Sequence, residues 1–308
     1  MLMETRLKRL QLAIKTTVNW PSAIAVWLGL AQECHARFKE GHVLKFNRNS
    51  WLEYLRCVYL FHHFPSATLA DNTVSFTYKG KKLSFAFGKY GFDTVLEIFG
   101  GDPYREFFES TSVRGKQVVD IGAAFGDTAI SFLLEGAKAV YAVEAFPGYF
   151  RLAEENIRRN GFSNSCQIIL AAAGKSPGAL RIDHDLEDMF GVGIESSEVG
   201  TSIPVITLEE IVNRFGVDSG ILKMDVEGYE YDILLNTDKA ILQKFSDMVI
   251  EYHYGFEELK RHLEDAGFVV KHTPPHLVYM PQLKDEQSRN MWVGNIYATR
   301  GKESRQTA

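Results

Sequence analysis

The sequence has only three cysteines in 308 residues: Cys34, Cys57 and Cys166. Their odd number and their lack of CxxC or metal-ligand spacing exclude a disulfide framework, so we expect a reducing, cytoplasmic setting. Long apolar runs are missing as well. The stretch from Pro21 to Ala31 has about half of the roughly 20 residues that a spanning helix needs. We therefore predict a buried helix there and no transmembrane segment.

Positive charge is also in deficit, because 34 Lys and Arg face 39 Asp and Glu and give a formal net charge of -5. The whole chain thus lacks a general electrostatic attraction to phosphate backbones, and no general nucleic-acid binding is expected. No internal repeat is present, which excludes a solenoid. The hydrophobic content of 45% is enough to fill the core of a globular protein.

The N-terminal part of the sequence shows helical and then hairpin patterns. Residues of roughly 4–18, 22–39 and 50–64 carry apolar positions at helical spacing, which predicts an N-terminal helical segment over residues 1–70. Alternating apolar residues around the turn KGKK predict a β-hairpin, and a short helical segment follows it. We assign the hairpin and this connecting helix to residues 71–114.

From residue 115 to residue 301, strand-like runs alternate with amphipathic helices. The seven runs are QVVDIG, AVYAVEA, CQIILAA, GILKMD, DMVIEYH, GFVVKHT and GNIYATR. This alternation predicts an α/β fold with a Rossmann-like, doubly wound sheet of seven strands and helices on both faces. An insertion over residues 175–219 contains a polar, acidic loop and a helix capped by Thr207 and Glu210. Residues 302–308 form a tail.

A glycine turn follows the first of these strands, in the segment VVDIGAAFGDTAISFL. The strand ends near Asp120, and the turn runs through Gly122 and Ala123 to Gly126. Glycines permit a tight turn and close backbone approach, and ligands of such sheets bind at the carboxyl ends of the strands. The spacing G-x-x-x-G lacks the middle glycine of the dinucleotide fingerprint, which favours S-adenosylmethionine over a nicotinamide cofactor.

A second cofactor mark lies at the end of the second strand. Glu144 follows Gly122 by 22 residues, about the distance at which an acidic residue reaches the ribose hydroxyls. After the third strand, small residues around Ala172 bring backbone to the same rim, where an adenine ring could lie. The predicted cofactor-binding residues are Asp120, Gly122, Ala123, Gly126, Glu144, Ala145 and Ala172.

These blocks resemble the FkbM-type class I methyltransferases over about residues 104–254. The resemblance rests on VVDIGAAFG, GAKAVYAVEAFPGYFRLAEENIRRN, LKMDVEGYE and VIEYH, in this order and spacing. It implies an S-adenosylmethionine-dependent enzyme that methylates hydroxyls of sugars and natural products. Two residues depart from the family pattern, since the family usually has Asn at Ala124 and Pro at Ala145. We assign no family resemblance to the first 100 residues.

Charged residues interrupt the fourth and fifth strands, where a covered parallel strand should be apolar. Lys223 and Asp225 are two residues apart, as are Glu251 and His253, so each pair lies on one face of its strand. We predict that these four and Glu227 form the catalytic site, with Asp225 and His253 orienting or deprotonating an acceptor hydroxyl.

Structural explanations stay open for the same residues. Lys223 and Glu251 could form an internal ion pair, and Glu227 could begin a helix and interact with its dipole. Asp225 with Glu251 or His253 could instead bind a divalent cation such as Mg²⁺, although no metal site is assigned.

The sequence thus predicts a methyltransferase that acts on a hydroxyl of a small molecule, sugar or glycan. Three alternatives remain: an N- or nucleic-acid-directed methyltransferase on the same fold, an NAD-dependent oxidoreductase, and a non-catalytic binding module. Base-modifying methyltransferases usually carry an Asn/Asp-Pro-Pro-Tyr/Phe motif after the fourth strand, where this chain has DVEG.

Overall fold

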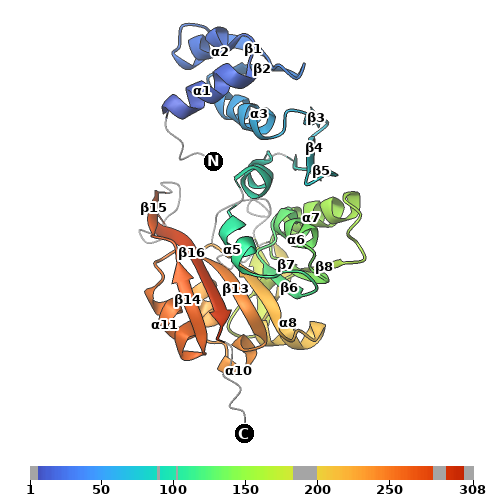
Figure 1. Ribbon diagram of the computed structural model, residues 1–308, viewed down its shortest axis with the longest axis vertical. Coiled ribbons are helices and arrows are strands. Elements are labelled where there is room, and N and C mark those ends of the chain that lie inside the picture. The colour runs from blue at the N-terminus through green and yellow to red at the C-terminus, as the bar shows by residue number, and fades with distance from the viewer. Residues whose placement is uncertain (1–5, 89–90, 102, 183–199, 280–288, 302–308) are drawn as a thin grey trace. The chain divides into compact units, whose positions relative to one another are not determined.

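The computed structural model of the protein describes residues 6–88, 91–101, 103–182, 200–279 and 289–301. The chain divides into two compact units, Met1–Arg105 and Glu106–Ala308 (Figure 1). The acidic loop predicted within the insertion, over residues 183–199, and the predicted tail lie outside the described residues. No helix in the described part of the chain is long and apolar enough to cross a membrane.

The first unit begins with helices and a two-stranded sheet. Its elements are α1 (Arg6–Thr16), α2 (Trp20–Trp27), β1 (Glu33–Arg37), β2 (Val43–Asn47) and α3 (Trp51–His63). The helix predicted over residues 22–39 is therefore wrong in its second half. Burial there alternates with period two, with Cys34 and Ala36 buried between exposed neighbours, and β1 pairs antiparallel with β2. The helices predicted near residues 4–18 and 50–64 are present as α1 and α3.

The predicted β-hairpin belongs to the same compact unit. It consists of β4 (Thr73–Tyr78) and β5 (Lys81–Ala86), and β3 (Thr68–Ala70) pairs with the outer edge of β4. The connecting helix is α4 (Asp93–Leu96), continued by the π-helical turn η2 (Glu97–Gly101). Phe76 of the hairpin stacks on Phe64 and contacts Phe99, so aromatic packing joins hairpin and helices.

The second unit is built on the predicted sheet, and all seven predicted strands are present. Its strands are β6 (Gln117–Ile121), β7 (Ala139–Glu144), β8 (Cys166–Leu170), β12 (Gly220–Met224), β13 (Phe245–Tyr252), β14 (Phe268–His272) and β16 (Asn290–Arg300). Their order is β14-β16-β13-β12-β6-β7-β8, and β15 (His276–Tyr279) extends the sheet beside β16. The strands from β13 to β8 are parallel, whereas β16 is antiparallel to β13 and β14.

The remaining elements of this unit connect and cover the sheet. The helices are α5 (Arg105–Ser110), α6 (Asp127–Leu134), α7 (Pro147–Arg159), α8 (Leu208–Phe215), α9 (Glu230–Leu234), α10 (Lys239–Leu242) and α11 (Glu257–Asp265). The insertion adds β10 (Gly178–Ile182) and β11 (Thr201–Ile206), which meet the short β9 (Ala172–Ala173). The predicted capping box of α8 is present, since Thr207 and Glu210 bond each other's backbone N–H groups.

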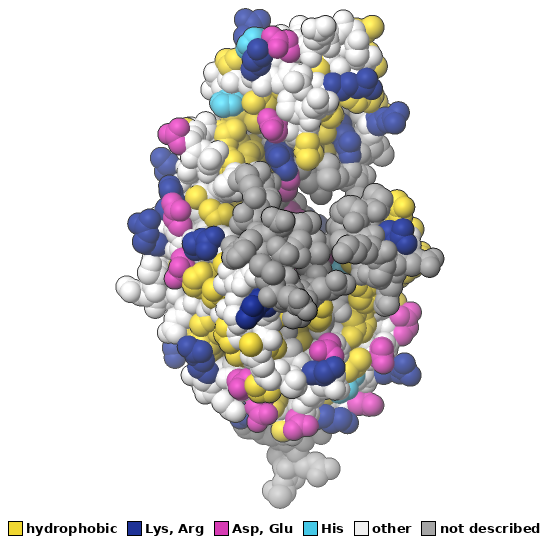
Figure 2. All heavy atoms as spheres, turned by 180° about the vertical axis from the view of Figure 1, so that it is seen from behind, with side chains coloured by type: hydrophobic (Ala, Val, Ile, Leu, Met, Phe, Trp, Pro, Cys, Tyr) yellow, Lys and Arg dark blue, Asp and Glu magenta, His cyan; other side chains and the backbone are white. Residues whose placement is uncertain are grey.

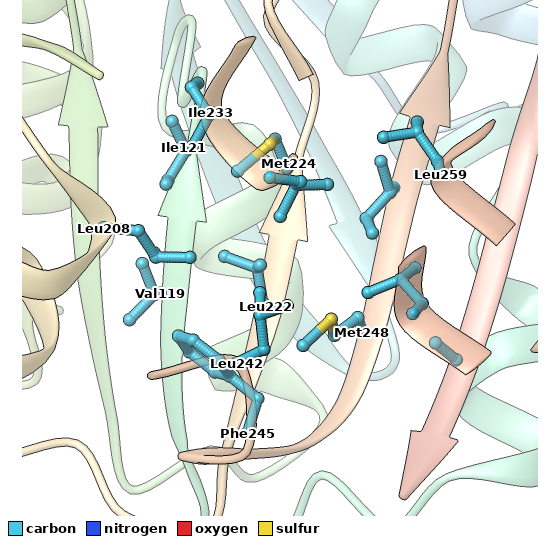
Figure 3. Packing of buried hydrophobic residues seen from close by; sticks show 14 of the residues in the cluster. Val119, Ile121, Leu208, Leu222, Met224, Ile233, Leu242, Phe245, Met248 and Leu259 are labelled. Atoms are coloured by element: carbon cyan, nitrogen blue, oxygen red, sulfur yellow. The ribbon is translucent and has the colours of Figure 1, made fainter. Parts of the chain in front are cut away.

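One hydrophobic core of the second unit lies between the sheet and the helices on one of its faces. Val119 of β6, Leu222 of β12 and Met248 of β13 pack there against Leu208 of α8 and Leu259 of α11 (Figure 3). Chain order reverses at the centre of the sheet, because β7 lies on one side of β6 and β12 on the other. Ligands bind at such a reversal, beyond the carboxyl ends of the strands.

Candidate active site

The turn after β6 requires glycine at its first position. Gly122 has a φ of +79°, and a Cβ added there would lie 1.8 Å from the carbonyl oxygen of Asp225. Its N–H donates to Val143 at 3.0 Å, and the N–H of Asp225 donates to Ile121 at 3.1 Å. The turns after β6 and β12 are thus in direct backbone contact, which places the predicted cofactor and catalytic residues at one edge of the sheet.

Lys223 and Asp120 form an ion pair beneath this turn. The Lys223 Nζ lies 3.1 Å from the Asp120 carboxylate and donates to the Gly122 carbonyl at 2.7 Å. Both side chains are buried, and the hydroxyl of Thr128 donates to the second Asp120 oxygen at 2.6 Å. The internal ion pair considered for Lys223 therefore exists, but Asp120 replaces the expected Glu251 because it is adjacent to Lys223 in the β12–β6 register. The Lys223–Asp120 pair thus stabilises the glycine turn after β6.

Glu144 lies at the carboxyl end of β7 and faces the same turn. One carboxylate oxygen accepts the Ala124 N–H at 2.8 Å, and the other accepts the Phe146 N–H at 2.8 Å. Burial raises the pKa of Glu144 to about 7, although these N–H groups oppose the shift. A carboxylate has about four acceptor positions, so Glu144 retains the capacity to accept hydrogen bonds from a ligand's hydroxyls.

Small residues lie in the turn after β6 and on β9. Ala123 is fully buried, and Gly126 caps α6 in the left-handed conformation, where an added Cβ would lie 3.4 Å from Ala153. Ala172 lies on β9 in a small apolar cluster, against which the partly buried Ala145 packs. The predicted cofactor residues are therefore gathered at the carboxyl ends of β6 and β7 and at β9.

Asp225, Glu227 and His253 meet at the carboxyl ends of β12 and β13. The Nε2 of His253 lies 3.3 Å from a Glu227 oxygen and 3.9 Å from an Asp225 oxygen. The imidazole is 4% exposed, whereas the side chains of Asp225 and Glu227 are 30% and 26% exposed. The carboxylates are therefore accessible from outside, and the imidazole lies behind them.

Sequence reasoning missed Glu230, which lies on the other side of the imidazole. Glu230 is fully buried at the start of α9, and one of its oxygens lies 3.1 Å from His253 Nδ1 and accepts the Val226 N–H at 2.9 Å. Its second oxygen has no hydrogen-bond partner among the described residues. The signal was the third acidic residue of the block DVEGYE, three positions after Glu227.

Two predictions about neighbouring residues are corrected by the structure. Glu227 does not begin a helix, because α9 starts at Glu230 and Glu227 has a φ of +53° in the preceding turn, so its side chain turns toward His253. Glu251 is half-buried on β13 opposite Asn295, outside the cluster formed by Asp225, Glu227 and His253.

The acidic surroundings control the protonation of His253. Burial by itself lowers the pKa of His253, but Glu230 and Glu227 outweigh it and hold the pKa well above 6.5. Burial raises the pKa of Glu227, and the nearby Asp225 adds to that shift while His253 opposes it. Carboxylates face both ring nitrogens and therefore favour the protonated, cationic form of the imidazole.

The same three side chains have the spacing of a cation site. Asp225, Glu227 and His253 each offer one ligand atom, and these atoms lie within 4.8 Å of one another. Carboxylate oxygens suit hard cations such as Mg²⁺. A metal that used the imidazole would first have to displace its proton.

The family model of the methyltransferase FkbM domain matches residues 120–270. This range includes the glycine turn after β6 as well as Asp225, Glu227 and His253. The ribosomal protein L11 methyltransferase of Vibrio campbellii (strain ATCC BAA-1116) is 32% identical over 65 residues, which are 21% of this chain and 22% of that protein. The chain thus matches about a fifth of the length of this curated relative.

Solved methyltransferase structures are similar at low identity. A putative RNA methyltransferase from Pyrococcus horikoshii gives a TM-score of 0.39 at 17% identity, covering 70% of this chain and 86% of that chain. A SAM dependent methyltransferase from Aquifex aeolicus gives 0.38 at 15% identity, covering 68% and 93%. The fold assignment rests on the strand order of the sheet itself. Residues 120–270 match the methyltransferase FkbM domain, and the strand order gives the unit that contains them a Rossmann-like class I fold.

Proposed function

We propose that the protein transfers the methyl group of S-adenosylmethionine to a hydroxyl of a small molecule, a sugar or a glycan. One observation carries the proposal: the partly exposed Asp225 carboxylate lies beside the buried imidazole of His253 at the edge of the sheet. A hydroxyl must lose its proton as its oxygen attacks carbon, and a carboxylate within reach of that proton can accept it.

The residues of the cluster then have distinct roles. Asp225 accepts the hydroxyl proton, since a protonated His253 cannot do so. The imidazolium stabilises the Asp225 and Glu227 carboxylates, and Glu230 fixes its Nδ1 side. The acceptor oxygen forms the new bond to the methyl carbon, the bond from that carbon to sulfur breaks, and the electron pair stays on sulfur.

The residues at the carboxyl ends of β6 and β7 fit the methyl donor. Glu144 retains acceptor positions for two ribose hydroxyls, and the Gly122–Gly126 turn brings backbone close to the ligand. S-adenosylmethionine supplies an electrophilic methyl group on a sulfonium when it is bound. The chain's own residues hold and orient it, and we assign this role to the cofactor-binding residues named from the sequence.

The sequence after β12 favours a hydroxyl over a nucleobase nitrogen. Asp225-Val226-Glu227-Gly228 stands where base-modifying enzymes usually have an Asn/Asp-Pro-Pro-Tyr/Phe motif. That the chain does not bind nucleic acid in general stays a prediction. We further propose that the N-terminal region contributes to acceptor recognition, because all the predicted cofactor residues follow residue 115.

The experiment is a transfer assay with methyl-labelled S-adenosylmethionine and three acceptor panels: hydroxylated metabolites and glycans, amine-bearing metabolites, and bulk RNA. We expect label in an O-methyl ether from the first panel, identified by its stability to base and by mass spectrometry. Transfer confined to the amine or RNA panel would contradict the proposed acceptor class while leaving the methyltransferase assignment intact.

A further inference from the structure

Exposed apolar side chains are concentrated in the N-terminal unit. Among the described residues, twelve large hydrophobic side chains are exposed, and seven of them lie between Leu7 and Val43. Leu30, at 78%, is the most exposed of the twelve. Figure 2 shows hydrophobic and basic side chains beside one another on one face of this unit. Exposed apolar clusters of this kind mark interaction sites.

The same region carries an excess of positive charge that the total for the chain conceals. Residues 1–105 contain 14 Lys and Arg against 8 Asp and Glu, whereas residues 106–308 contain 20 against 31. Between residues 5 and 32 there are four basic residues and no acidic one. A partner of this region is therefore expected to be anionic.

The C-terminal end of α2 and the turn after it present the most exposed of these side chains. We call Trp27, Leu28, Gly29 and Leu30 the α2 corner. The predicted buried helix of this segment ends here with Leu28 56% and Leu30 78% exposed. Trp27 stacks on Trp51 at 6.2 Å, and the Arg48 guanidinium lies 3.7 Å from the Cβ position of Gly29.

The backbone of the α2 corner is already hydrogen-bonded. The N–H groups of Leu28, Gly29 and Leu30 donate to carbonyls of α2 at distances between 2.8 and 3.1 Å. Entry of the two leucines into an apolar phase therefore buries none of these donors unpaired, which would be costly. The corner presents its leucines in a fixed arrangement.

Helix α1 adds a second surface of the same character. Leu7 and Ile14 are seven residues apart, so they lie on one face of the helix, and both are exposed. Lys8 and Lys15 follow them at the same spacing. Basic residues beside exposed apolar ones are the pattern of helices that lie in the interface of an anionic membrane.

We propose that the N-terminal unit binds the surface of an anionic lipid bilayer, with Leu28 and Leu30 inserted at the depth of the headgroups. Arg48 and the basic residues of α1 contact lipid phosphates. A nucleic acid would match the positive charge but would leave the leucines in water, whereas a bilayer takes up both. This proposal does not depend on the methyl acceptor.

The test is co-sedimentation of the full-length protein with vesicles of phosphatidylcholine alone or with about one third phosphatidylglycerol. We expect binding to the anionic vesicles and weaker binding as salt rises, because salt screens the charge. The double variant Leu28→Ser, Leu30→Ser should lower the partition coefficient about tenfold or more, because two exposed leucines leave the lipid. Arg48→Gln should lower it about fivefold.

The matched control is Val269→Ser, which removes an apolar side chain that is 63% exposed on β14 of the other unit. It should bind vesicles like the original protein, and all variants should keep their affinity for S-adenosylhomocysteine. Failure of the original protein to bind anionic vesicles at low salt overturns the proposal, as does equal loss in the control. If the protein does not bind vesicles but the double variant changes its oligomeric mass in solution, the two leucines form a protein interface instead. That result also overturns the proposal.

Discussion

The two halves of the sheet's carboxyl edge hold their acidic side chains in different ways. At the ends of β6 and β7, the carboxylates of Asp120 and Glu144 are buried and bond to backbone N–H groups, a hydroxyl and Lys223. At the ends of β12 and β13, Asp225 and Glu227 are partly exposed and face the buried imidazole of His253. We propose that the first half binds the cofactor and that the second half provides the partly exposed carboxylate that accepts the proton.

Because of this difference, a side-chain substitution in one half of the edge should leave the other half intact. The contact between the Gly122 turn and Asp225 runs through backbone, so a change of the Asp225 side chain leaves the binding half in place. A change at Glu144 likewise removes an acceptor without touching His253. Substitutions in the two halves should therefore have separable effects on turnover and on affinity for the cofactor.

The largest effect is expected from Asp225→Asn. The substitution keeps the shape of the side chain and removes the charge that accepts the proton, so turnover should fall about 10² or more. Affinity for S-adenosylhomocysteine should persist. The measurement is the rate of label transfer at saturating donor and acceptor.

Chelation separates the two possible uses of this carboxylate. Activity that is lost with EDTA and restored by Mg²⁺ would make Asp225 a metal ligand, and indifference to EDTA supports direct proton transfer. An Asp225→Asn protein with full activity would sink the assignment and leave Asp225, Glu227 and His253 as a structural charge network.

A smaller effect on turnover is expected from Glu230→Gln, which tests how the catalytic half is positioned. Gln can still accept the Val226 N–H but carries no charge to hold the imidazolium, so the pKa of His253 should fall and turnover should fall about tenfold. The pKa is followed by NMR of the ring proton, and Glu258→Gln, an exposed residue of α11, is the control. An unchanged His253 pKa would contradict this role.

A still smaller effect is expected when the pH changes the protonation of Glu144 and thereby the affinity for the cofactor. Burial raises the pKa of Glu144 to about 7, and its ionised form is the one that accepts hydrogen bonds from ribose hydroxyls. Affinity for S-adenosylhomocysteine should therefore weaken as the pH falls through 7, by at most tenfold per pH unit. Calorimetry between pH 6 and pH 8 measures this, and Glu144→Gln should show a flatter profile. An equally steep profile in that variant would assign the dependence to another group.

The stability of the folded protein should depend on pH in the opposite direction. A raised carboxyl pKa stabilises the folded protein fully below the usual value of 4.5, and this stabilisation is lost as the pH rises through about 7. Ligand binding near neutral pH thus works against the tendency of the buried Glu144 to stay protonated.

Periodicity was sufficient to predict the large sheet and the β4–β5 hairpin but not the two-stranded sheet of β1 and β2. The seven strands of the second unit are apolar runs of strand length that alternate with amphipathic helices, which is the pattern of a doubly wound sheet. In the segment over residues 22–39, β1 is a five-residue strand whose pattern also fits a helix, and only its pairing with β2 decides between the two. Tertiary contacts of this kind are not visible in a local pattern.

Site residues that lie at the end of a strand were predictable from the sequence. Residues whose position depends on the conformation of a turn were less so. Asp225 and His253 were placed together because neighbouring parallel strands end at one edge. The partner of Lys223 was wrong because β12 also neighbours β6, which offers Asp120 in register. Glu230 was missed because its approach to His253 depends on the turn at Glu227, whose positive φ the sequence does not reveal.

The most direct test of the account is calorimetric titration of S-adenosylhomocysteine into the original protein, Glu144→Ala and Asp225→Asn. Hydrogen bonds to a charged group contribute roughly 1.5–3 kcal/mol, so Glu144→Ala should weaken binding by about tenfold or more while Asp225→Asn leaves it unchanged. Thermal unfolding should confirm that both variants are folded. Unchanged affinity in Glu144→Ala, or an equal loss in both variants, would contradict the division of the edge into a binding half and a catalytic half.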